Sequence, residues 1–274
     1  MGKDLTITLV PPHSLVLEVE NLTVSRGGNV VVKDVNIQVK HGEFVGIVGP
    51  NGSGKTSLLM AILGILKFNK GSVKIYGAPN TQNKFKSRVA WVSQTAINMP
   101  SSSKITVREL ISLGTVRFRN MIFPLDKKRI DRVERAIELV GLSDVADKNI
   151  AKLSGGQKQR AVIGKALASN ADFLLLDEPL VGVDRESRNS LLKLLDDLCH
   201  DQNKTIVMVS HDLAAIKQTT HRIIYIDNSI QFDGKPSDLP DLEVLAGLRG
   251  IKHVHGEAGE EGFRETDLCC DEED

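Results

Sequence analysis

One short motif constrains this chain more than any other feature of its sequence. Residues 49–56 read GPNGSGKT, a full match to the pattern G-x-x-x-x-G-K-[ST]. The apolar segment EFVGIV at 43–48 precedes the motif, and SLLMAILGIL at 57–66, with helical spacing, follows it. A glycine-rich turn between a buried strand and a helix lets backbone N–H groups converge on a phosphate at the positive end of the helix. The motif therefore predicts a nucleotide-binding α/β domain.

The side chains of this loop suit a nucleoside triphosphate with Mg²⁺. Lys55 places a positive charge on the β- and γ-phosphates, and the Thr56 hydroxyl is a ligand for Mg²⁺. An ordinary glycine-rich turn is the alternative, but the lysine and the flanking strand and helix argue against it. The expected phosphate site comprises Gly49, Pro50, Asn51, Gly52, Ser53, Gly54, Lys55, Thr56 and Ser57.

The rest of the chain alternates between apolar strands and helical segments. Residues 15–39 are expected to form strands, with a hairpin turn at Gly27-Gly28. Further short apolar strands are expected at 43–48, 172–177, 205–210 and 222–227. This pattern predicts an α/β fold of the P-loop NTPase type, with a mostly parallel sheet covered on both faces and an N-terminal antiparallel β portion.

Strand signals are absent between about residues 105 and 150. Amphipathic helices are expected there, with one apolar face formed by Ile130, Val133, Ile137 and Val140. We therefore expect an α-helical subdomain inserted at about 95–155. It would belong to a single domain over residues 1–249, followed by an acidic, disordered tail over 250–274.

Two carboxylates follow the apolar run LLL at 174–176. A buried strand that ends in Asp177-Glu178 brings negative charge to the carboxyl edge of the sheet, where ligands of open α/β sheets bind. Asp177 is placed to hold Mg²⁺, and Glu178 to act as a general base on the attacking water. A solvated turn would be the usual interpretation of such a pair, were the phosphate loop not present.

A second anion-binding surface is predicted at LSGGQ, residues 153–157. The group Ser154, Gly155, Gly156 and Gln157 opens a helix, so its N–H groups and dipole favour an anion, although a plain N-cap by Ser154 is the alternative. One nucleotide does not need two such sites from one chain. The spacing therefore suggests that each chain offers one site to its own nucleotide and the other to a partner's.

The motifs GPNGSGKT, LSGGQ, LLLDEP and Ser210-His211-Asp212, in this order, resemble the ATPase subunits of ABC transporters. LSGGQ is the discriminating element, and the resemblance covers about residues 15–240. It implies a homodimer that sandwiches two ATP molecules with Mg²⁺, with Lys55 and Glu178 in catalytic roles. It also implies an integral membrane permease as partner and a peripheral position on the cytoplasmic side of the plasma membrane.

Other roles are implied only by position within this family. Gln94 matches the glutamine that senses Mg²⁺, His211 the switch histidine that contacts the γ-phosphate, and Asp184 the D-loop aspartate at the dimer seam. Each taken alone has an ordinary explanation, as a loop amide, a strand-end cap and a helix N-cap. Arg26 stands where a tyrosine that stacks on adenine is usual, and its guanidinium plane can also lie on a π-face.

The substrate is suggested only by subfamily resemblance. The segments ITVREL at 105–110 and IFP at 122–124, with LDEPLVGVD, look most like ATPases of zinc and manganese uptake systems. That resemblance implies an extracytoplasmic substrate-binding protein as a further partner. The alternatives are another substrate, such as an iron complex, and an ABC-type ATPase without a transport role.

Composition restricts the remaining functional classes. The 35 basic and 35 acidic residues cancel, and aromatic residues make up 4% of the chain, so nucleic acid is not an expected partner. Three cysteines do not make a secreted disulfide framework. The neutrality hides an asymmetry, because residues 256–274 carry nine acids against Arg264, or −8, which leaves +8 on the rest. Part of that positive excess is a group of basic residues at 117–135, which suits an anionic membrane surface. A solvated helix face is the alternative interpretation. The group comprises Arg117, Arg119, Lys127, Lys128, Arg129, Arg132 and Arg135.

Both termini carry weak signals. The tail contains His253, His255, Cys269 and Cys270 among carboxylates. Imidazole, thiolate and carboxylate groups all bind transition metals, but the spacing of these residues matches no defined zinc site. A flexible acidic tail is the simpler interpretation. Gly2 and Thr6 match the short N-myristoylation pattern, which carries little weight alone.

Overall fold

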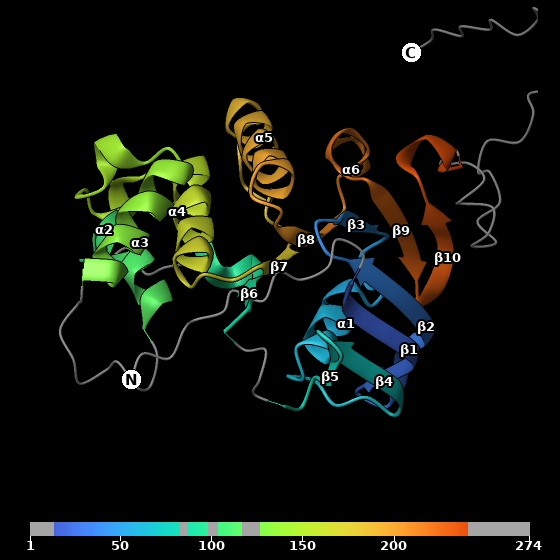
Figure 1. The fold of residues 1–274 in the computed structure, drawn as a ribbon. Helices are drawn as coiled ribbons and strands as arrows, with labels where there is room; N and C mark the ends of the chain where they lie inside the picture. The colour runs from blue at the N-terminus through green and yellow to red at the C-terminus, as the bar shows by residue number, and fades with distance from the viewer. Residues whose placement is uncertain (1–13, 83–86, 98–103, 117–126, 241–274) are drawn as a thin grey trace, which may run out of the picture. The chain divides into compact units, whose positions relative to one another are not determined.

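The computed structural model describes residues 14–82, 87–97, 104–116 and 127–240. An antiparallel sheet and a mostly parallel sheet carry the fold, and helices cover them (Figure 1). The antiparallel sheet has the order β2-β1-β4-β5 and contains β1 (Leu15–Arg26), β2 (Asn29–Lys40), β4 (Lys70–Ile75) and β5 (Ala78–Pro79). Gly27 and Gly28 both have positive φ between β1 and β2, which confirms the predicted hairpin turn.

The second sheet has six strands in the order β10-β9-β3-β8-β7-β6. Every pair is parallel except the edge pair of β10 and β9, which confirms the predicted mostly parallel sheet. Apolar residues fill the central strands on both faces, as a doubly covered parallel sheet requires. Its strands are β3 (Phe44–Val48), β6 (Val89–Val92), β7 (Phe173–Asp177), β8 (Thr205–Ser210), β9 (Arg222–Asp227) and β10 (Ser229–Gly234).

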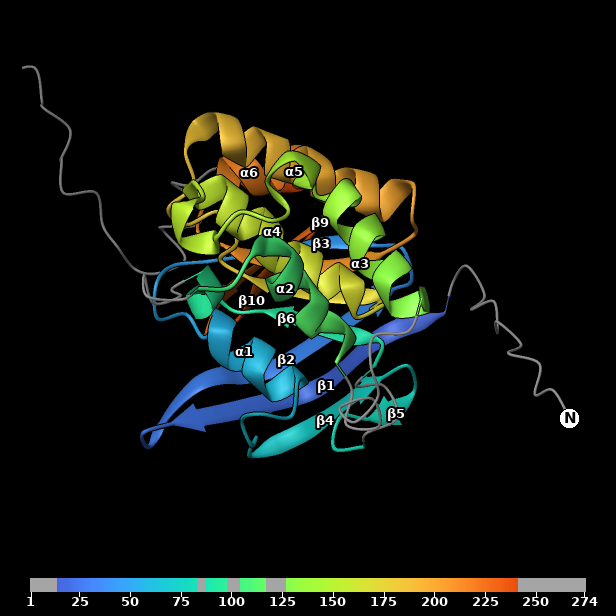
Figure 2. The same ribbon diagram turned by 90° about the vertical axis from the view of Figure 1, so that its left-hand side faces the viewer.

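Helix α1 (Lys55–Ile62) lies between the two sheets, whereas α5 (Arg185–His200) and α6 (Leu213–Thr219) cover the opposite face of the larger sheet (Figures 1 and 2). One hydrophobic core joins α1 to both sheets, with Leu58 and Ile62 fully buried in it. The helix that follows the phosphate loop is therefore held from two sides. It ends at Ile62, earlier than the apolar spacing of 57–66 predicted.

Three helices gather beside β6: α2 (Val107–Ser112), α3 (Lys127–Leu139) and α4 (Gly155–Ala168) (Figure 2). Helices α2 and α3 fall within the range 95–155 where an inserted helical subdomain is expected, whereas α4 begins at the end of that range. Val133, Ile137 and Val140 are buried as expected, but the prediction for Ile130 was wrong, because its side chain is 46% exposed. Arg129 was also misassigned to a basic face, since its side chain is buried and its Nε donates to Thr115 Oγ1 at 3.3 Å. Short 3₁₀ segments connect the elements at Gln94–Ile97, Leu113–Thr115, Ser143–Val145, Ile150–Lys152 and Pro236–Asp238.

Several expectations fall outside the described residues. They concern Gly2, Thr6, Arg117, Arg119, residues 122–124 and the tail with His253, His255, Cys269 and Cys270. Within the described part of the chain, no helix has the length and apolar character needed to cross a bilayer.

Candidate nucleotide site

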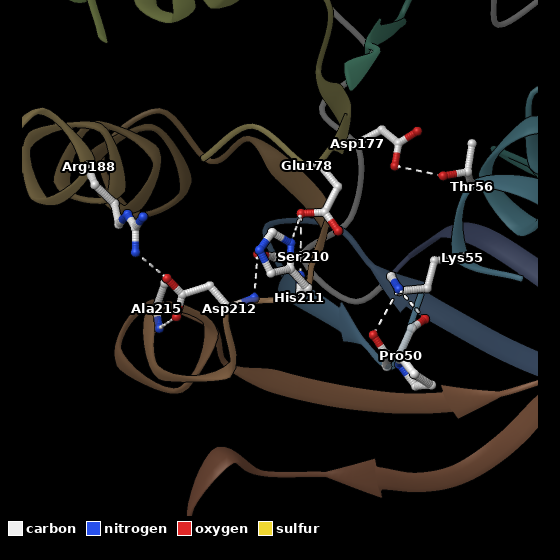
Figure 3. A network of polar contacts seen from close by, with 11 residues as sticks. Pro50, Lys55, Thr56, Asp177, Glu178, Arg188, Ser210, His211, Asp212 and Ala215 are labelled. Carbon is white, nitrogen blue, oxygen red and sulfur yellow. Dashed lines mark hydrogen bonds and ion pairs between the residues drawn. The ribbon is translucent and has the colours of Figure 1, made fainter. Parts of the chain in front are cut away.

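The parallel strands bring the predicted site residues to one edge of the larger sheet. Val48, the last residue of β3, pairs with Ser210 at the end of β8, and Asp177 of β7 pairs with Val209. The loop 49–54, the two carboxylates at the end of β7 and His211 therefore all lie at the carboxyl edge of the sheet (Figure 3). Residues as far apart in sequence as Val48 and Ser210 become neighbours because their strands are parallel and in register.

The backbone of the phosphate loop requires glycine at two positions. Gly49 has φ 156°, and a Cβ there would lie 2.0 Å from the Ile226 carbonyl oxygen. Gly54 has φ 95°, and a Cβ there would lie 2.2 Å from the Val31 carbonyl oxygen. The backbones of β9, at Ile226, and of β2, at Val31, thus lie too close to the loop for a side chain at either glycine. This packing fixes the shape of the loop.

Lys55 and Ser53 point their polar atoms within this loop. The Lys55 ammonium donates to the carbonyl oxygens of Gly49 at 2.8 Å and Pro50 at 2.7 Å (Figure 3). The Ser53 hydroxyl is buried and has no hydrogen-bond partner among the described residues. A buried hydroxyl without a partner is unfavourable, so a phosphate oxygen entering the loop would satisfy it. The loop therefore fits the triphosphate that its sequence predicts.

Thr56 and Asp177 form the oxygen-rich side of the site. The Thr56 hydroxyl donates to Asp177 Oδ1 at 3.2 Å, and the Asp177 side chain is almost fully buried. Burial raises the pKa of the Asp177 carboxyl above its usual range, with the neighbouring Glu178 adding to the rise, whereas the Thr56 hydrogen bond and Lys55 oppose it. A hydroxyl and a carboxylate side by side are ligands that Mg²⁺ accepts, and its charge would stabilise the ionised carboxylate. The pair therefore fits the predicted Mg²⁺ position.

Glu178 and His211 meet at the mouth of the site. Glu178 Oε2 lies 2.8 Å from His211 Nδ1, and it also accepts the His211 backbone N–H at 3.3 Å (Figure 3). The Glu178 side chain is 10% exposed, whereas the His211 side chain is 60% exposed. Glu178 has φ 52°, a left-handed conformation that is uncommon for glutamate, and its N–H donates to the Val209 carbonyl oxygen. A strained backbone thus aims this carboxylate at the histidine.

These residues surround a cavity of about 460 Å³. Arg26 and Gln94, which were predicted only by their position in the family, both belong to its lining. Val31 and Val181 also line it, although nothing in their sequence context marked them. The full lining is Arg26, Val31, Asn51, Gly52, Gly54, Lys55, Thr56, Ser57, Gln94, Glu178, Val181 and His211.

The LSGGQ residues lie elsewhere, because none of Ser154, Gly155, Gly156 and Gln157 belongs to that lining. Ser154 Oγ accepts the Gln157 N–H at 3.2 Å, and the Gln157 side chain accepts the Ser154 N–H at 3.1 Å, so the two residues form a capping box at the start of α4. A Cβ at Gly156 would lie 2.4 Å from Ser187 Cβ. The motif therefore packs directly against the start of α5.

Asp184 is the N-cap of α5. Its carboxylate accepts the Ser187 N–H at 2.9 Å, and the hydrogen bonds from Ser187 hold the pKa of the carboxyl below its usual value. The ordinary explanation considered for this residue, a helix cap, is thus what the described chain shows. Its sequence neighbour Val183 and its hydrogen-bond partner Ser187 both lie against Gly156, so Asp184 is close to the LSGGQ motif.

Sequence reasoning missed an ion pair close to the site. Arg188 of α5 donates to Asp212, the residue after His211, and Asp212 caps α6 (Figure 3). No local pattern could have joined two residues that are 24 positions apart and on different helices.

Comparisons with known proteins agree with this geometry. The sequence profile described as "ABC transporter" matches residues 32–181. The zinc uptake system ATP-binding protein ZurA of Listeria monocytogenes is 34% identical over 240 residues, which cover 85% of this chain and 93% of that protein. The manganese transport system ATP-binding protein MntB of Listeria innocua is 34% identical over 218 residues, with 80% and 89% covered.

A solved structure extends the likeness to three dimensions. It is a dimeric ATP-binding cassette in a post-hydrolysis state bound to ADP and Pi, with a TM-score of 0.68 and 28% identity; 80% of this chain and 98% of that chain are covered. The profile covers more than half of the present chain, and it includes the phosphate loop, the LSGGQ motif and both carboxylates. The chain therefore belongs to the ABC transporter family, as one of its ATP-binding subunits.

Proposed function

We propose that this chain hydrolyses ATP to power the import of zinc or manganese through a partner membrane permease. The observation that carries the proposal is the contact of Glu178 with His211 at the mouth of a glycine-shaped phosphate loop. Relatives named as zinc and manganese uptake ATP-binding proteins match most of the chain and supply the substrate class.

Nucleotide binding follows from the loop and its cavity. Backbone N–H groups within residues 51–56 and the Ser53 hydroxyl donate to phosphate oxygens, and Lys55 leaves its two carbonyl partners to neutralise the β- and γ-phosphates. Arg26 lines the cavity, where its guanidinium plane would stack on the base. Thr56, Asp177 and Gln94 would hold Mg²⁺, which neutralises charge on the phosphates when bound.

The chemical step belongs to Glu178 and His211. Glu178 orients and polarises the water that attacks the γ-phosphorus, while the bond to the β–γ bridging oxygen breaks and ADP leaves. His211 contacts the γ-phosphate and, through its hydrogen bond, fixes the Glu178 carboxylate. Lys55 stabilises negative charge as it develops on the transferred group.

We further propose that two copies enclose two ATP molecules. The capping box and the close packing of Gly156 against Ser187 give the LSGGQ turn a fixed shape, yet it takes no part in its own chain's cavity. The Gly155 and Gly156 N–H groups, which the capping box does not use, would bind the γ-phosphate in a second copy, with Asp184 at the seam. The dimeric cassette with bound ADP and Pi supports this arrangement.

The remaining partners follow from the transport role. An integral membrane permease would hold the chain at the cytoplasmic side of the plasma membrane, and an extracytoplasmic protein would deliver the ion. The exposed basic residues of α3, Lys127, Lys128 and Arg135, suit an anionic leaflet there.

Uptake of radioactive ions tests the proposal directly. Cells of the source organism are given ⁶⁵Zn²⁺, ⁵⁴Mn²⁺ or ⁵⁵Fe³⁺ citrate. They carry the wild-type chain, Glu178→Gln or the control Lys193→Ala, whose position is exposed. We expect Glu178→Gln to abolish the chain-dependent uptake of zinc or manganese and Lys193→Ala to preserve it. Loss of iron uptake alone would assign an iron complex as the substrate, and unchanged uptake of all three would refute metal import.

A further inference from the structure

The ion pair between Arg188 and Asp212 ties two helices together beside the chemical site. Arg188 lies on the second turn of α5, and its guanidinium donates to Asp212 Oδ2 (Figure 3). Among the described residues, Asp212 is the only carboxylate within ion-pair distance of Arg188. The pair joins residues 24 positions apart and is partly shielded from solvent.

Asp212 fixes the backbone that carries His211. Its other carboxylate oxygen accepts the Ala215 N–H at 3.0 Å, which caps α6, and its own N–H donates to Ser210 Oγ at 3.0 Å. The His211 side chain is mostly exposed and contacts Glu178 alone among the described polar groups. Its orientation therefore depends on how firmly the backbone of residues 210–212 is held.

The same end of α5 packs against the LSGGQ motif. Ser187, the neighbour of Arg188, leaves no room for a Cβ at Gly156, and Asp184 caps the helix at its start. A displacement of the LSGGQ turn would therefore move the first turns of α5. Through Arg188 that movement reaches Asp212 and the adjacent His211.

We propose that Arg188 is a positioning residue for ATP hydrolysis, which acts through Asp212 to hold His211 against Glu178. It links the surface around Gly156 to the histidine of the same chain. This inference rests on the proposed ATP hydrolysis and adds a residue outside the nucleotide cavity, since neither Arg188 nor Asp212 lines it.

The test uses the full chain and two complementary substitutions. Arg188→Ala removes the guanidinium, whereas Asp212→Asn removes the carboxylate charge but keeps Oδ1 as the cap of α6. Arg188→Lys restores the positive charge, and Lys193→Ala, at an exposed position of the same helix, is the matched control. Steady-state hydrolysis gives kcat and KM, titration gives the ATP dissociation constant, and circular dichroism reports folding.

We expect Arg188→Ala and Asp212→Asn each to lower kcat about tenfold, with the ATP dissociation constant within about twofold of wild type. The double variant should be no slower than either single variant, because both remove one interaction. Arg188→Lys should recover part of the loss. In a His211→Ala background, Arg188→Ala should have no further effect, which distinguishes positioning of His211 from a general structural role.

Three results would overturn the inference. The first is a kcat of Asp212→Asn within twofold of wild type. The second is that Arg188→Ala lowers kcat by the same factor in the wild-type and His211→Ala backgrounds, and the third is that the variants weaken ATP binding without lowering kcat. If Arg188→Ala does not fold, Asp212→Asn and Arg188→Lys decide by the same criteria. Absence of hydrolysis in the wild type would refute the proposed activity and this inference together, whereas hydrolysis without metal uptake would refute only the transport role.

Discussion

Nδ1 of His211 lies 2.8 Å from Oε2 of Glu178, and this carboxylate oxygen also accepts the His211 backbone N–H. The glutamate is held in a left-handed backbone conformation, so both its backbone and its side chain are fixed at one place. Such conformations persist where the surrounding structure determines them, and they concentrate at active sites. The two residues therefore form one unit, and substitutions at either should have linked effects.

Replacing Glu178 with Gln should separate hydrolysis from binding. Glutamine keeps the size of the side chain but cannot take a proton from the attacking water, so we expect kcat to fall about 10²-fold or more. The ATP dissociation constant should stay within about threefold of wild type, because Glu178 lies beside the phosphate loop rather than in it. Phosphate release and equilibrium titration measure the two quantities. Undiminished turnover would show that another group activates the water.

The linkage between Glu178 and His211 gives a second prediction. His211→Ala should lower kcat by a similar factor, and the double variant should be far less impaired than the product of the two single effects. Single-turnover hydrolysis by the wild type, the two single variants and the double variant gives the double-mutant cycle. Lys193→Ala is the control for differences in preparation of the variants. Fully multiplicative losses would mean that the contact between Glu178 and His211 has no role in the reaction.

Gly156→Ala should disturb both the fold and the LSGGQ turn. The new Cβ would lie 2.4 Å from Ser187 Cβ, so α4 and α5 must separate. Overpacking of this kind costs about 1–3 kcal/mol of unfolding free energy. Urea denaturation monitored by circular dichroism measures the loss, and we expect hydrolysis to fall in the same protein because the start of α5 moves.

A compensating substitution controls this prediction. Ser187→Gly removes the opposing Cβ but keeps the backbone N–H that binds Asp184. Alone it should cost about 0.5 kcal/mol from the difference in helix propensity between serine and glycine, in addition to the loss of the Ser187 side-chain hydrogen bond to Asp184. Combined with Gly156→Ala, it should recover part of the lost stability. A double variant whose losses simply add would show that the close contact does not limit packing at this place.

Local sequence patterns were sufficient for the main elements of the fold. The phosphate loop, the hairpin at Gly27-Gly28 and the buried strands each have a signature within a few residues, and the structure has them at those positions. Edge strand β10 was not predicted, because SIQFDG lacks the continuous apolar run of the central strands. Ile130 was placed on the apolar face by its spacing, yet the residue is 46% exposed.

The residues of the site could be predicted where they belong to a recognisable sequence motif or match a position of the family. Lys55, Thr56, Asp177 and Glu178 belong to recognisable motifs, and parallel strands bring them to one edge. The Arg188–Asp212 ion pair depends instead on how α5 packs beside α6, which is a property of the whole fold. Nothing within ten residues of Arg188 indicates its partner.

Arg26 offers a test of how the base is held. It is exposed and lines the nucleotide cavity, at the end of β1 beside the hairpin turn. If the guanidinium stacks on the base, Arg26→Ala should weaken ATP binding about two- to fivefold, and Arg26→Tyr should restore it. Because stacking tolerates any base, the ratio of ATP to GTP affinity should change little in calorimetry. Equal affinity for wild type and Arg26→Ala would remove Arg26 from the site.

Cys199 should be chemically inert in the folded chain. Its thiol is buried and donates to the Gly42 carbonyl oxygen at 3.2 Å, and burial, with Asp196 and Glu43 nearby, raises its pKa to about 12. The thiolate is the reactive form, so alkylation by iodoacetamide at pH 8 should be roughly a thousandfold slower than for an ordinary cysteine. The rate should rise about tenfold per pH unit while the fold persists, because the thiolate fraction does. Peptide mass mapping resolves Cys199 from Cys269 and Cys270, and denatured protein provides the reference rate. Equal rates in native and denatured protein would show that this thiol is accessible.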